Sequence, residues 1–293
     1  MPVNTKAIRK RIKSVTSTKK ITKTMEMVAT SKLKFAQDAV LASSPYAKLL
    51  RSVMSEVAAR VPDRGSFPLL RESAQPKRTL VFVVTSNRGL CGGFNSNLIR
   101  LGRKTIREET AAGRTPVVYA AGKKGIAAFR WLGIHVEKKF TELPDKPTYE
   151  SAEALAEELT APFLAGEVDR VLVVYPDFRS LGSQPPSVLR LCPLGGGEAE
   201  KKAGEPSAEF LFAPSPRAIL EKLLPLYVRL SVYRVLVSSV ASEQIARRTA
   251  MKLASDNAEE MVTLLTRNYN KARQAQITQE LAEIIGGSEA LQK

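Results

Sequence analysis

Cysteine and histidine, which mark many metal and redox proteins, are scarce in this chain. Its 293 residues include two cysteines and one histidine. Cys91 and Cys192 stand far apart, so they form neither a disulfide framework nor a pair with metal-ligand spacing. We therefore expect a reducing compartment, no metal site and no bound cofactor.

Long apolar runs are also missing. The longest stretches, such as Leu80–Val84, are far shorter than the roughly 20 residues that span a bilayer. The first residues are basic and poor in acid, as in an organelle transit peptide, but the same amphipathic pattern continues to about Val40 without a cleavage-like break. The sequence predicts no transmembrane segment, and a transit peptide is the less favoured interpretation.

Acidic residues are too few to balance the basic ones. The chain has 45 Lys and Arg against 29 Asp and Glu, a net charge of +16. Such a chain attracts nucleic acid, anionic lipid or acidic protein surfaces, although a solvated charged face is the ordinary alternative. A basic nucleic-acid-binding coiled-coil protein is therefore the alternative function. Against it, the basic stretches lack interleaved aromatic residues and follow a helical period.

Glycine and proline are absent from a long stretch at the start of the chain. None occurs from Val3 to Ser44, and we expect Pro45 to end this helix, which would be roughly 60 Å long. With its flanks we assign residues 1–60 to the first helix. Its expected apolar positions are Ile8, Ile12, Val15, Ile21, Met25, Val28, Leu33, Ala36 and Val40.

A second stretch without glycine or proline runs from Leu226 to Ile285, roughly 90 Å as a helix. We assign residues 216–286 to this helix and expect the pair Gly286-Gly287 to end it. Steps of three and four give a line broken only by Gln244, Arg247 and Asn268. The line is Leu223, Leu226, Leu230, Tyr233, Val237, Val240, Gln244, Arg247, Met251, Ala254, Ala258, Met261, Leu265, Asn268, Ala272 and Ala275.

A repeat of 3.5 residues held this long predicts a left-handed supercoil that needs a partner helix. The first helix is the obvious partner, so the two chain ends are expected to form an antiparallel two-helix coiled coil. After Ala275 the apolar line moves to Ile277, Leu281 and Ile284, which indicates a new face for a new partner. In an antiparallel pair the last part of the second helix should project alone.

The middle of the chain alternates between strand and helix patterns, which predicts an inserted α/β, Rossmann-like domain at 76–213 with a mostly parallel sheet. The expected strands are Thr79–Thr85, Thr115–Ala120 and Arg170–Tyr175, with edge strands at Val188–Cys192 and Glu209–Phe212. The expected helices are Asn97–Thr110, Lys123–Trp131 and Ser151–Leu164. The segment 195–207 reads as a mobile loop.

No catalytic set is readable. The glycine-rich turn Ser86–Asn95 lies between a strand and a helix, but its glycines match neither a dinucleotide fingerprint nor a P-loop. Gly122-Lys123 lacks the earlier glycine and the following hydroxyl of a P-loop. His135, at an expected strand start, has no metal-binding or acid-base neighbours, and Cys91 has no partner base. We expect no catalytic residue and no enzyme activity in the chain itself.

Five blocks along the chain resemble the ATP synthase gamma subunit family. Ile8–Val15 (IRKRIKSV) and Ile21–Ala29 (ITKTMEMVA) are similar to its opening helix, and Arg88–Gly93 (RGLCGG) is similar to its middle turn. Tyr269–Leu281 (YNKARQAQITQEL) and Ile285–Gly287 (IGG) resemble its closing signature. The blocks lie at both ends and in the middle, in family order, so the resemblance covers nearly the whole chain.

This resemblance implies a rotating shaft that regulates the catalytic sites of an ATP synthase and couples transmembrane proton flow to ATP synthesis. The implied partners are a hexamer of alpha and beta subunits, the epsilon subunit and the c-subunit ring, with no nucleic acid. The beta subunits would carry the catalytic sites. The implied location is peripheral, on the cytoplasmic side of a bacterial inner membrane or the equivalent organelle face.

The resemblance also implies which residues meet those partners. They are Met25 in the first helix, Arg88 and Cys91 in the middle turn, and Arg273, Gln274, Thr278 and Glu280 near the C-terminus. Arg273 and Gln274 follow seam residue Ala272 by about 100° and 200° around the helix, so both should face outward. Cys91 is expected at the surface of its turn.

Two positions depart from the family pattern, and one segment differs from that of photosynthetic relatives. Asn87 stands where an Asp is common, which affects any charge-dependent contact there. Ala213 stands where an acidic residue is expected in the segment that would face the c-ring. Residues 195–207 contain no cysteine, unlike the inserted dithiol of photosynthetic relatives, so thiol regulation is not expected.

Overall fold

The computed structural model describes residues 5–59, 66–194 and 215–291, which form two compact units. One unit joins the two chain ends, residues 1–29 and 247–293, and the other comprises residues 30–246. Two long helices, α1 (Thr5–Ala59) and α5 (Pro216–Leu291), each contribute to both units. Each unit is described in turn.

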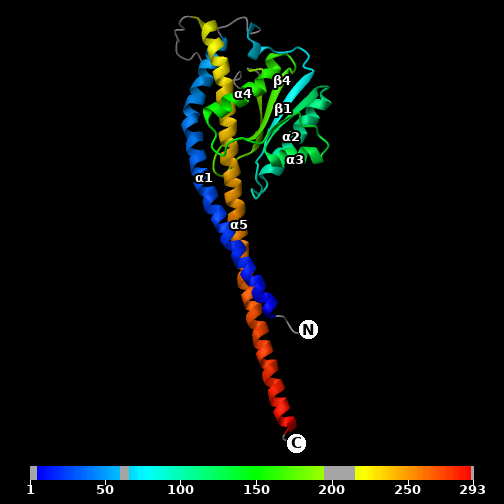
Figure 1. Ribbon diagram of the computed structural model, residues 1–293. Coiled ribbons are helices and arrows are strands. Elements are labelled where there is room, and N and C mark those ends of the chain that lie inside the picture. Colours follow the sequence, from blue (N-terminus) through cyan, green and yellow to red (C-terminus); the bar gives the residue numbers. More distant parts are fainter. Residues whose placement is uncertain (1–4, 60–65, 195–214, 292–293) are drawn as a thin grey trace. The chain divides into compact units, whose positions relative to one another are not determined.

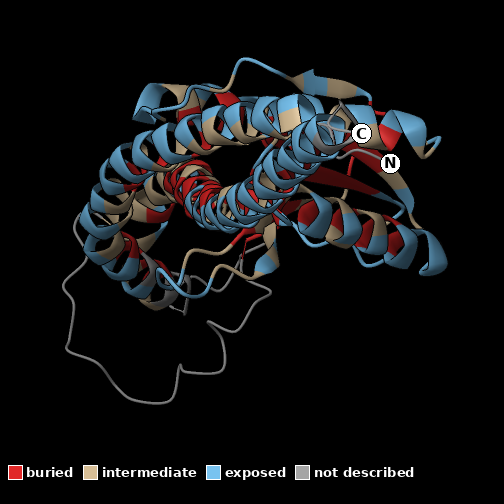
Figure 2. Cartoon of the chain, turned by 90° about the horizontal axis from the view of Figure 1, so that it is seen from below, coloured by how far each residue is buried: buried red, intermediate tan, exposed pale blue. Residues whose placement is uncertain are grey.

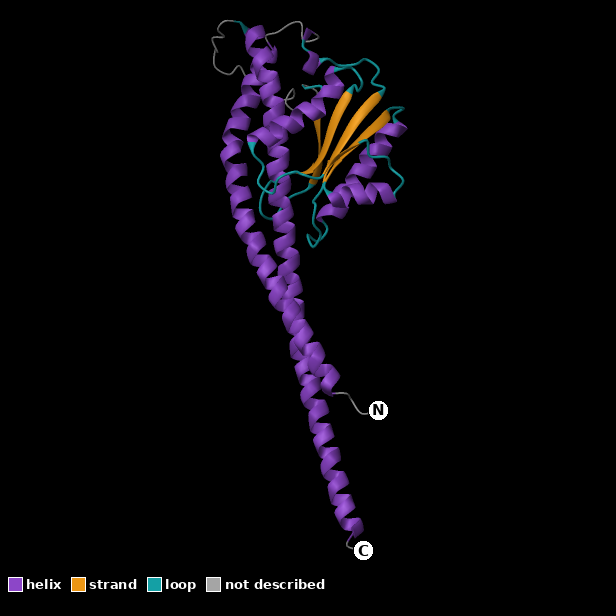
Figure 3. Cartoon of the chain, viewed as in Figure 1, coloured by secondary structure: helices purple, strands orange, loops and turns teal. Residues whose placement is uncertain are grey.

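The unit 30–246 is built on a five-stranded sheet in the order β3-β2-β1-β4-β5 (Figures 1 and 3). Strands β1, β2, β3 and β4 are parallel, and β5 pairs antiparallel with β4. The strands are β1 (Arg78–Val84), β2 (Thr115–Ala121), β3 (Lys138–Phe140), β4 (Arg170–Pro176) and β5 (Pro186–Cys192). The α/β fold class is thereby confirmed.

Helices cover both faces of the sheet. The alternating residues Val81 and Val83 of β1 pack with α2 (Phe94–Ala111) and α3 (Lys123–Trp131), while Leu80, Phe82 and Val84 face the other side. On that side lie α4 (Tyr149–Leu164), the short helix η2 (Pro68–Leu70) and the parts of α1 and α5 in this unit. Because β1 is central, both faces of its strand are buried, as its continuous apolar run indicates.

The expected strands and helices of the middle region match the observed ones closely, with two differences. Strand β3 was expected only as a strand start at His135, whereas it begins at Lys138. Its bounds were not predicted, because Lys138–Phe140 carries two lysines and no β-branched residue. His135, expected at a strand start, lies exposed in the loop before β3. The expected strand Glu209–Phe212, the loop 195–207 and Ala213 lie outside the described residues.

Pro45 does not end the first helix, contrary to expectation. Helix α1 continues to Ala59 with Pro45 inside it. The residues that follow explain this, because Ala47, Leu50, Met54 and Val57 are buried in the main core of the unit. Their burial outweighs the hydrogen bond that proline removes from a helix.

The glycine pair near the C-terminus does not end the second helix either. Helix α5 runs through Gly286 and Gly287 to Leu291. Neither glycine adopts the positive φ that closes a helix in a left-handed turn. The expected boundary at residue 286 is therefore wrong.

Helix α5 is the one described helix that is long and apolar enough, by length and composition alone, to cross a membrane. Half of its apolar 18-residue window, which has a mean hydropathy of 1.4, is buried inside the structure. Leu220, Leu224, Val228, Val232 and Leu236 belong to the main core of the unit 30–246. The apolar character of this helix is accounted for by its packing against the sheet.

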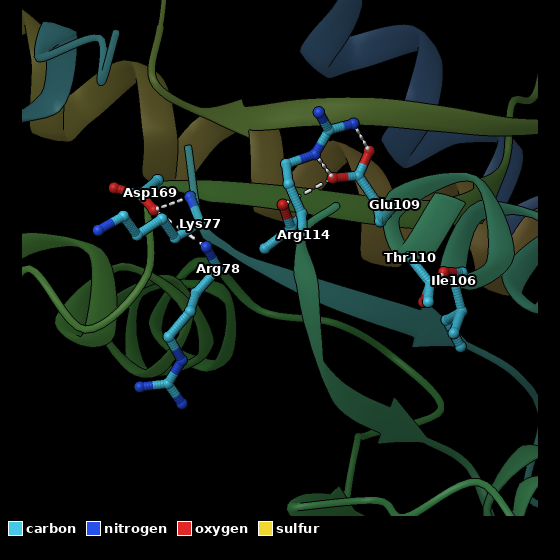
Figure 4. A network of polar contacts seen from close by, with 8 residues as sticks. Lys77, Arg78, Ile106, Glu109, Thr110, Arg114 and Asp169 are labelled. Atoms are coloured by element: carbon cyan, nitrogen blue, oxygen red, sulfur yellow. Dashed lines mark hydrogen bonds and ion pairs between the residues drawn. The ribbon is translucent and has the colours of Figure 1, made fainter. Parts of the chain in front are cut away.

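Polar contacts hold the amino ends of β1, β2 and β4 together (Figure 4). Arg114, just before β2, donates to the carboxylate of Glu109 at 2.5 and 2.9 Å, and the hydroxyl of Thr79 on β1 donates to the same carboxylate at 2.7 Å. Asp169, before β4, accepts from the backbone amides of Lys77 and Arg78 at 2.7 and 3.0 Å. Each carboxylate thereby pairs the starts of neighbouring strands.

The Glu109 carboxylate should contribute stability that depends on pH. Burial acts to raise its pKa, but hydrogen bonds from Arg114 and Thr79 outweigh burial and lower the pKa below its ordinary value of 4.5. A carboxyl group with a lowered folded-state pKa stabilises the fold above its unfolded pKa, and this stability is lost as the pH falls through the folded value. Glu109→Gln should therefore cost about 2 kcal/mol at pH 7 and progressively less below pH 4.5.

Urea unfolding of the chain at several pH values measures this effect. Glu108→Gln, at the exposed neighbouring position, is the matched control and should change little. An equal loss for Glu109→Gln at pH 7 and pH 3 would show that shape rather than charge matters at this position.

The unit formed by the chain ends is an antiparallel coiled coil. Thr5 of α1 lies against Gln276 of α5 at 3.4 Å, and Lys19 pairs with Glu259 at 3.0 Å, so rising numbers in one helix meet falling numbers in the other. This confirms the expected pairing of the two terminal helices. The register leaves the residues after Gln276 beyond the described start of α1.

The phase of the seam differs from the expected one. On α5 the less exposed positions are 247, 250, 251, 254, 255, 258, 262, 265, 269 and 272. Met261 and Asn268 of the expected line are therefore exposed, and Val262 and Tyr269 take their places. Ala275 is exposed too. On α1, Ile21 and Val28 are exposed, at 60% and 52%, and Thr22 and Ala29 are buried instead. The seam keeps a period of about 3.5 residues, but every second position after Ala258 lies one residue later than the expected line.

A pair of hydroxyl groups explains the shift. Thr22 Oγ1 and Ser255 Oγ lie 2.7 Å apart and are both buried in the seam. A buried polar pair in a coiled coil specifies one register, because slippage leaves its groups unpaired. The expected seam followed apolar residues and passed over Thr22 and Ser255. It therefore ran through the adjacent residues Ile21 and Ala254.

Removing both of these hydroxyls should cost less than the sum of the costs of removing each one alone. Thr22→Ala leaves the Ser255 hydroxyl buried without its partner, and we expect a loss of about 1–3 kcal/mol in unfolding free energy. The double variant Thr22→Ala with Ser255→Ala should lose less than the sum of the single variants Thr22→Ala and Ser255→Ala. Thr24→Ala, whose hydroxyl bonds its own exposed helix at Lys20, is the control. Additive losses would argue against a coupled pair.

Candidate partner-binding site

The C-terminal end of α5 presents its side chains to solvent. Every residue from Arg273 to Ser288 is exposed, and the end near the C label in Figure 2 has the colour of exposed residues. Arg273, Gln274, Thr278 and Glu280, the expected contact residues, are all among them. Their outward orientation agrees with the sequence argument, and what they contact stays a prediction.

An exposed apolar row lies on the same helical end. Ile277, Leu281, Ile284 and Ile285 are 47%, 53%, 68% and 64% exposed. Their spacing of four, three and one places them on one side of the helix. Four large aliphatic side chains grouped in this way indicate a surface that another molecule covers. This is the new face that the change of the apolar line after Ala275 indicated.

The sides of the coiled coil carry further exposed apolar residues that the sequence pattern did not single out as surface. Met27 is 58% exposed on α1, and Leu253 and Leu264 are 61% and 57% exposed on α5. Met25, the expected contact, is only half exposed, next to the ion pair of Lys23 and Glu26 at 3.0 Å. None of Met27, Leu253 and Leu264 belongs to the expected apolar lines, and no contact was expected for them.

The middle turn after β1 is held by its own side chains. Asn95 donates to Ser86 Oγ at 2.8 Å and to Cys91 Sγ at 3.2 Å, and Ser86 Oγ donates to the carbonyl of Arg88 at 2.5 Å. Leu90 has a positive φ of 61°, a conformation that is strained for a side chain of this size. The turn is therefore a compact, preformed feature that exposes Arg88 and Leu90.

Cys91 is not at the surface of this turn, contrary to expectation. It is 2% exposed, because the turn folds its thiol inward against Asn95 and the core below α2. The sequence showed the flanking glycines but not the direction of the side chain. Contact of the Cys91 thiol with a partner is therefore excluded in this conformation, while Arg88, with a side chain that is 72% exposed, remains available.

The two thiols should resist modification in the folded chain. Cys192 is also fully buried, and burial raises the pKa of its thiol to about 12, so the reactive thiolate is scarce. We expect a polar maleimide to label neither Cys91 nor Cys192 in native chain, and to label both after unfolding in guanidinium. Mass spectrometry counts the labels. Rapid single labelling of native chain at Cys91 would contradict the buried position.

Asn87 has a structural role that fits its amide rather than a carboxylate. Its Oδ1 accepts from the backbone amide of Lys123 at 3.1 Å, at the start of α3. Its Nδ2 donates to the carbonyl of Thr141 at 3.0 Å, just after β3. An aspartate accepts the first bond but has no donor for the second. Asparagine at position 87, where the family commonly has aspartate, thus connects the middle turn to the start of α3 and to the segment after β3.

The start of α3, another candidate anion site, is occupied by protein groups. The backbone amide of Lys123 donates to Asn87 Oδ1, and that of Lys124 donates to the carbonyl of Ser86. The amide of Gly125 donates to the hydroxyl of Thr85. Helix amides that already have partners do not cradle a phosphate. The structure thus gives a physical reason why Gly122-Lys123 is not a nucleotide site.

Within the described ranges no group of three or more His, Cys, Asp or Glu residues is placed to hold a metal ion.

Comparison with known proteins gives one family. The family model described as ATP synthase matches residues 4–291. The ATP synthase gamma chain of Gemmatimonas aurantiaca is 47% identical over 98% of this chain and 98% of its own length. The gamma chain of Leptospira biflexa is 42% identical over 97% of this chain and 98% of its own.

Solved structures share the fold. A chain of the Euglena gracilis mitochondrial ATP synthase matches with a TM-score of 0.65 and 20% identity, covering 98% of this chain and 94% of its own. A chain of the Tetrahymena thermophila mitochondrial ATP synthase, from the central stalk and c-ring, matches with a TM-score of 0.56 and 24% identity. This match covers 80% of the present chain and 99% of the Tetrahymena chain. Together with the match of the family model over nearly the whole length, these relatives show that the chain belongs to the ATP synthase gamma chain family.

Proposed function

We propose that this chain is the rotating central shaft of an ATP synthase, coupling transmembrane proton flow to ATP synthesis and regulating the catalytic sites. The observation that carries the proposal is the helical end 273–288 of α5, which is exposed throughout and has an apolar row on one side. A helix end of this kind is unfavourable in water unless another protein surrounds it. A hexamer of alpha and beta subunits that encloses the end supplies such a surface.

The coiled coil suits the transmission of torque. Its seam is closed by packed residues and by the hydroxyl pair of Thr22 and Ser255, so twisting one helix against the other exposes apolar surface and breaks a buried hydrogen bond. Both effects oppose slippage. The two helices of the coiled coil therefore turn together when force acts on their end.

The remaining partners follow from family membership and from charge. We propose that the beta subunits perform the ATP chemistry, and that the epsilon subunit and the c-subunit ring bind this chain. A net charge of +16 favours acidic partner surfaces. The complex then places this chain peripherally on the cytoplasmic side of a bacterial inner membrane, or on the equivalent face of an organelle. No specific observation favours nucleic-acid binding as a second function.

Co-purification tests this proposal. Tagged chain isolated from its own cells in mild detergent should bring down alpha, beta and epsilon subunits and the c-ring in fixed stoichiometry. The isolated chain should hydrolyse no ATP, whereas the complex should. Recovery of the chain with nucleic acid and without these subunits would refute the proposal.

A further inference from the structure

A groove in the unit 30–246 lies apart from the surfaces described so far. It is formed by α1, α5 and the loop before α4, and its volume is about 210 Å³. Small side chains on α1 leave this space between the two helices. The groove is lined by Lys32, Phe35, Ala36, Ala39, Asp145, Lys146, Pro147, Val237 and Val240.

The lining is apolar except for three charged side chains. Phe35, 57% exposed, and the two valines of α5 offer an aromatic and aliphatic surface that water wets poorly. An exposed phenylalanine beside an open apolar groove is a costly feature in a soluble domain unless something covers it. The apolar part of a ligand would gain by replacing water there.

The charges around the groove are predominantly positive. Lys146 Nζ lies 4.4 Å from the centroid of the Phe35 ring, directly beside the apolar lining. Lys32 Nζ lies 2.6 Å from Asp145 Oδ2, and Arg88 lies 3.8 Å from the same oxygen. Lys32 and Arg88 thus contact the one carboxylate, and Lys146 lies beside the ring, so the three cations exceed the carboxylate by two charges. This charge excess favours an anion.

We propose that this groove binds a small amphipathic anion, a carboxylate with an aliphatic body. The body lies over Phe35 and the valines, and the carboxylate pairs with Lys146 and Lys32. The groove is smaller than the roughly 300–1,000 Å³ of sites for drug-sized ligands. A ligand of about ten heavy atoms, such as a medium-chain fatty acid, matches it. The site does not depend on the shaft function proposed above.

Bound ligand would connect three elements that meet at the groove. It would contact α1, α5 and the loop that carries Asp145 at once, and this loop is linked through Arg88 to the middle turn. The proposal therefore predicts that ligand also raises the thermal midpoint of the chain.

Isothermal titration calorimetry with decanoate on the full chain tests the site. We expect binding of one decanoate per chain, and binding of decylammonium at least tenfold weaker, because the body is the same and the charge is reversed. The double variant Lys32→Gln with Lys146→Gln should bind decanoate at least tenfold more weakly. Ala39→Leu, which fills the groove, should remove binding.

A matched control separates the site from general attraction by charge. Lys34→Gln with Lys139→Gln removes the same net charge at exposed positions that do not line the groove, and should change affinity less than twofold. Equal weakening by both double variants would overturn the proposal, as would equal binding of decanoate and decylammonium or no binding of decanoate. Circular dichroism checks the fold of each variant, and the exposed lysine variants remain informative if Ala39→Leu does not fold.

Discussion

Replacing Gly122 by alanine should destabilise the α/β unit by about 3–5 kcal/mol, the largest stability effect that we expect from one methyl group. Gly122 precedes α3 with a φ of 88°, which side chains rarely adopt. A Cβ atom there would lie 2.2 Å from the carbonyl oxygen of Thr85, which is backbone and cannot move without distorting β1. The backbone strain at positive φ and the steric overlap with Thr85 therefore both lower the free energy of unfolding of this variant.

Gly113→Ala is the matched control for this prediction. Gly113 also has a positive φ, of 75°, but a Cβ atom there meets nothing within 4 Å. Only the cost of the left-handed conformation applies, about 1–2 kcal/mol. Urea unfolding followed by circular dichroism compares the two variants. Equal losses would show that the close approach between Gly122 and Thr85 has no energetic weight.

The double variant Arg273→Ala with Gln274→Ala should lower ATP hydrolysis by the reconstituted complex about tenfold, which corresponds to about 1.4 kcal/mol of lost interaction. Both side chains are exposed on the end of α5, so we propose that they form polar contacts with the beta subunits. For the same reason, the thermal stability of the free chain should change by no more than about 0.5 kcal/mol.

A second exposed pair serves as the control for Arg273 and Gln274. Arg107→Ala with Glu108→Ala alters adjacent exposed positions on α2 and should leave hydrolysis unchanged. If the Arg273 and Gln274 variant unfolds the free chain, these residues are structural. If its complex hydrolyses ATP at the rate of the unaltered complex, they do not bind the beta subunits.

The broad architecture was predictable because it depends on residue types with strong local preferences. Alternating β-branched runs gave three parallel strands to within one or two residues, and uninterrupted helical patterns at both ends gave the coiled coil. The bounds of strand β3 were not predicted, because pairing with β2, and not its own Lys-Lys-Phe sequence, makes it a strand. Pro45 misled for a similar reason, since tertiary burial overrode a local signal.

Details of the candidate site depended on directions that sequence patterns do not specify. The seam includes the buried contact of Thr22 with Ser255, and polar residues give no hydrophobic signal from which this position could be read. Cys91 was misplaced because a turn with positive φ at Leu90 and Gly92 decides where its side chain points. By contrast, the solvent exposure of Arg273 and Gln274 was predicted, because helix geometry alone turns these side chains away from Ala272.

Observation of rotation in single complexes tests the central claim most directly. Both native cysteines are buried, so Trp131→Cys, at a position where the native side chain is 85% exposed, provides one reactive thiol for a bead. With the alpha and beta subunits fixed to glass and ATP supplied, the bead should turn in one direction in regular steps. A bead that remains still while the fixed hexamers hydrolyse ATP at the normal rate would contradict the account of this chain as a shaft.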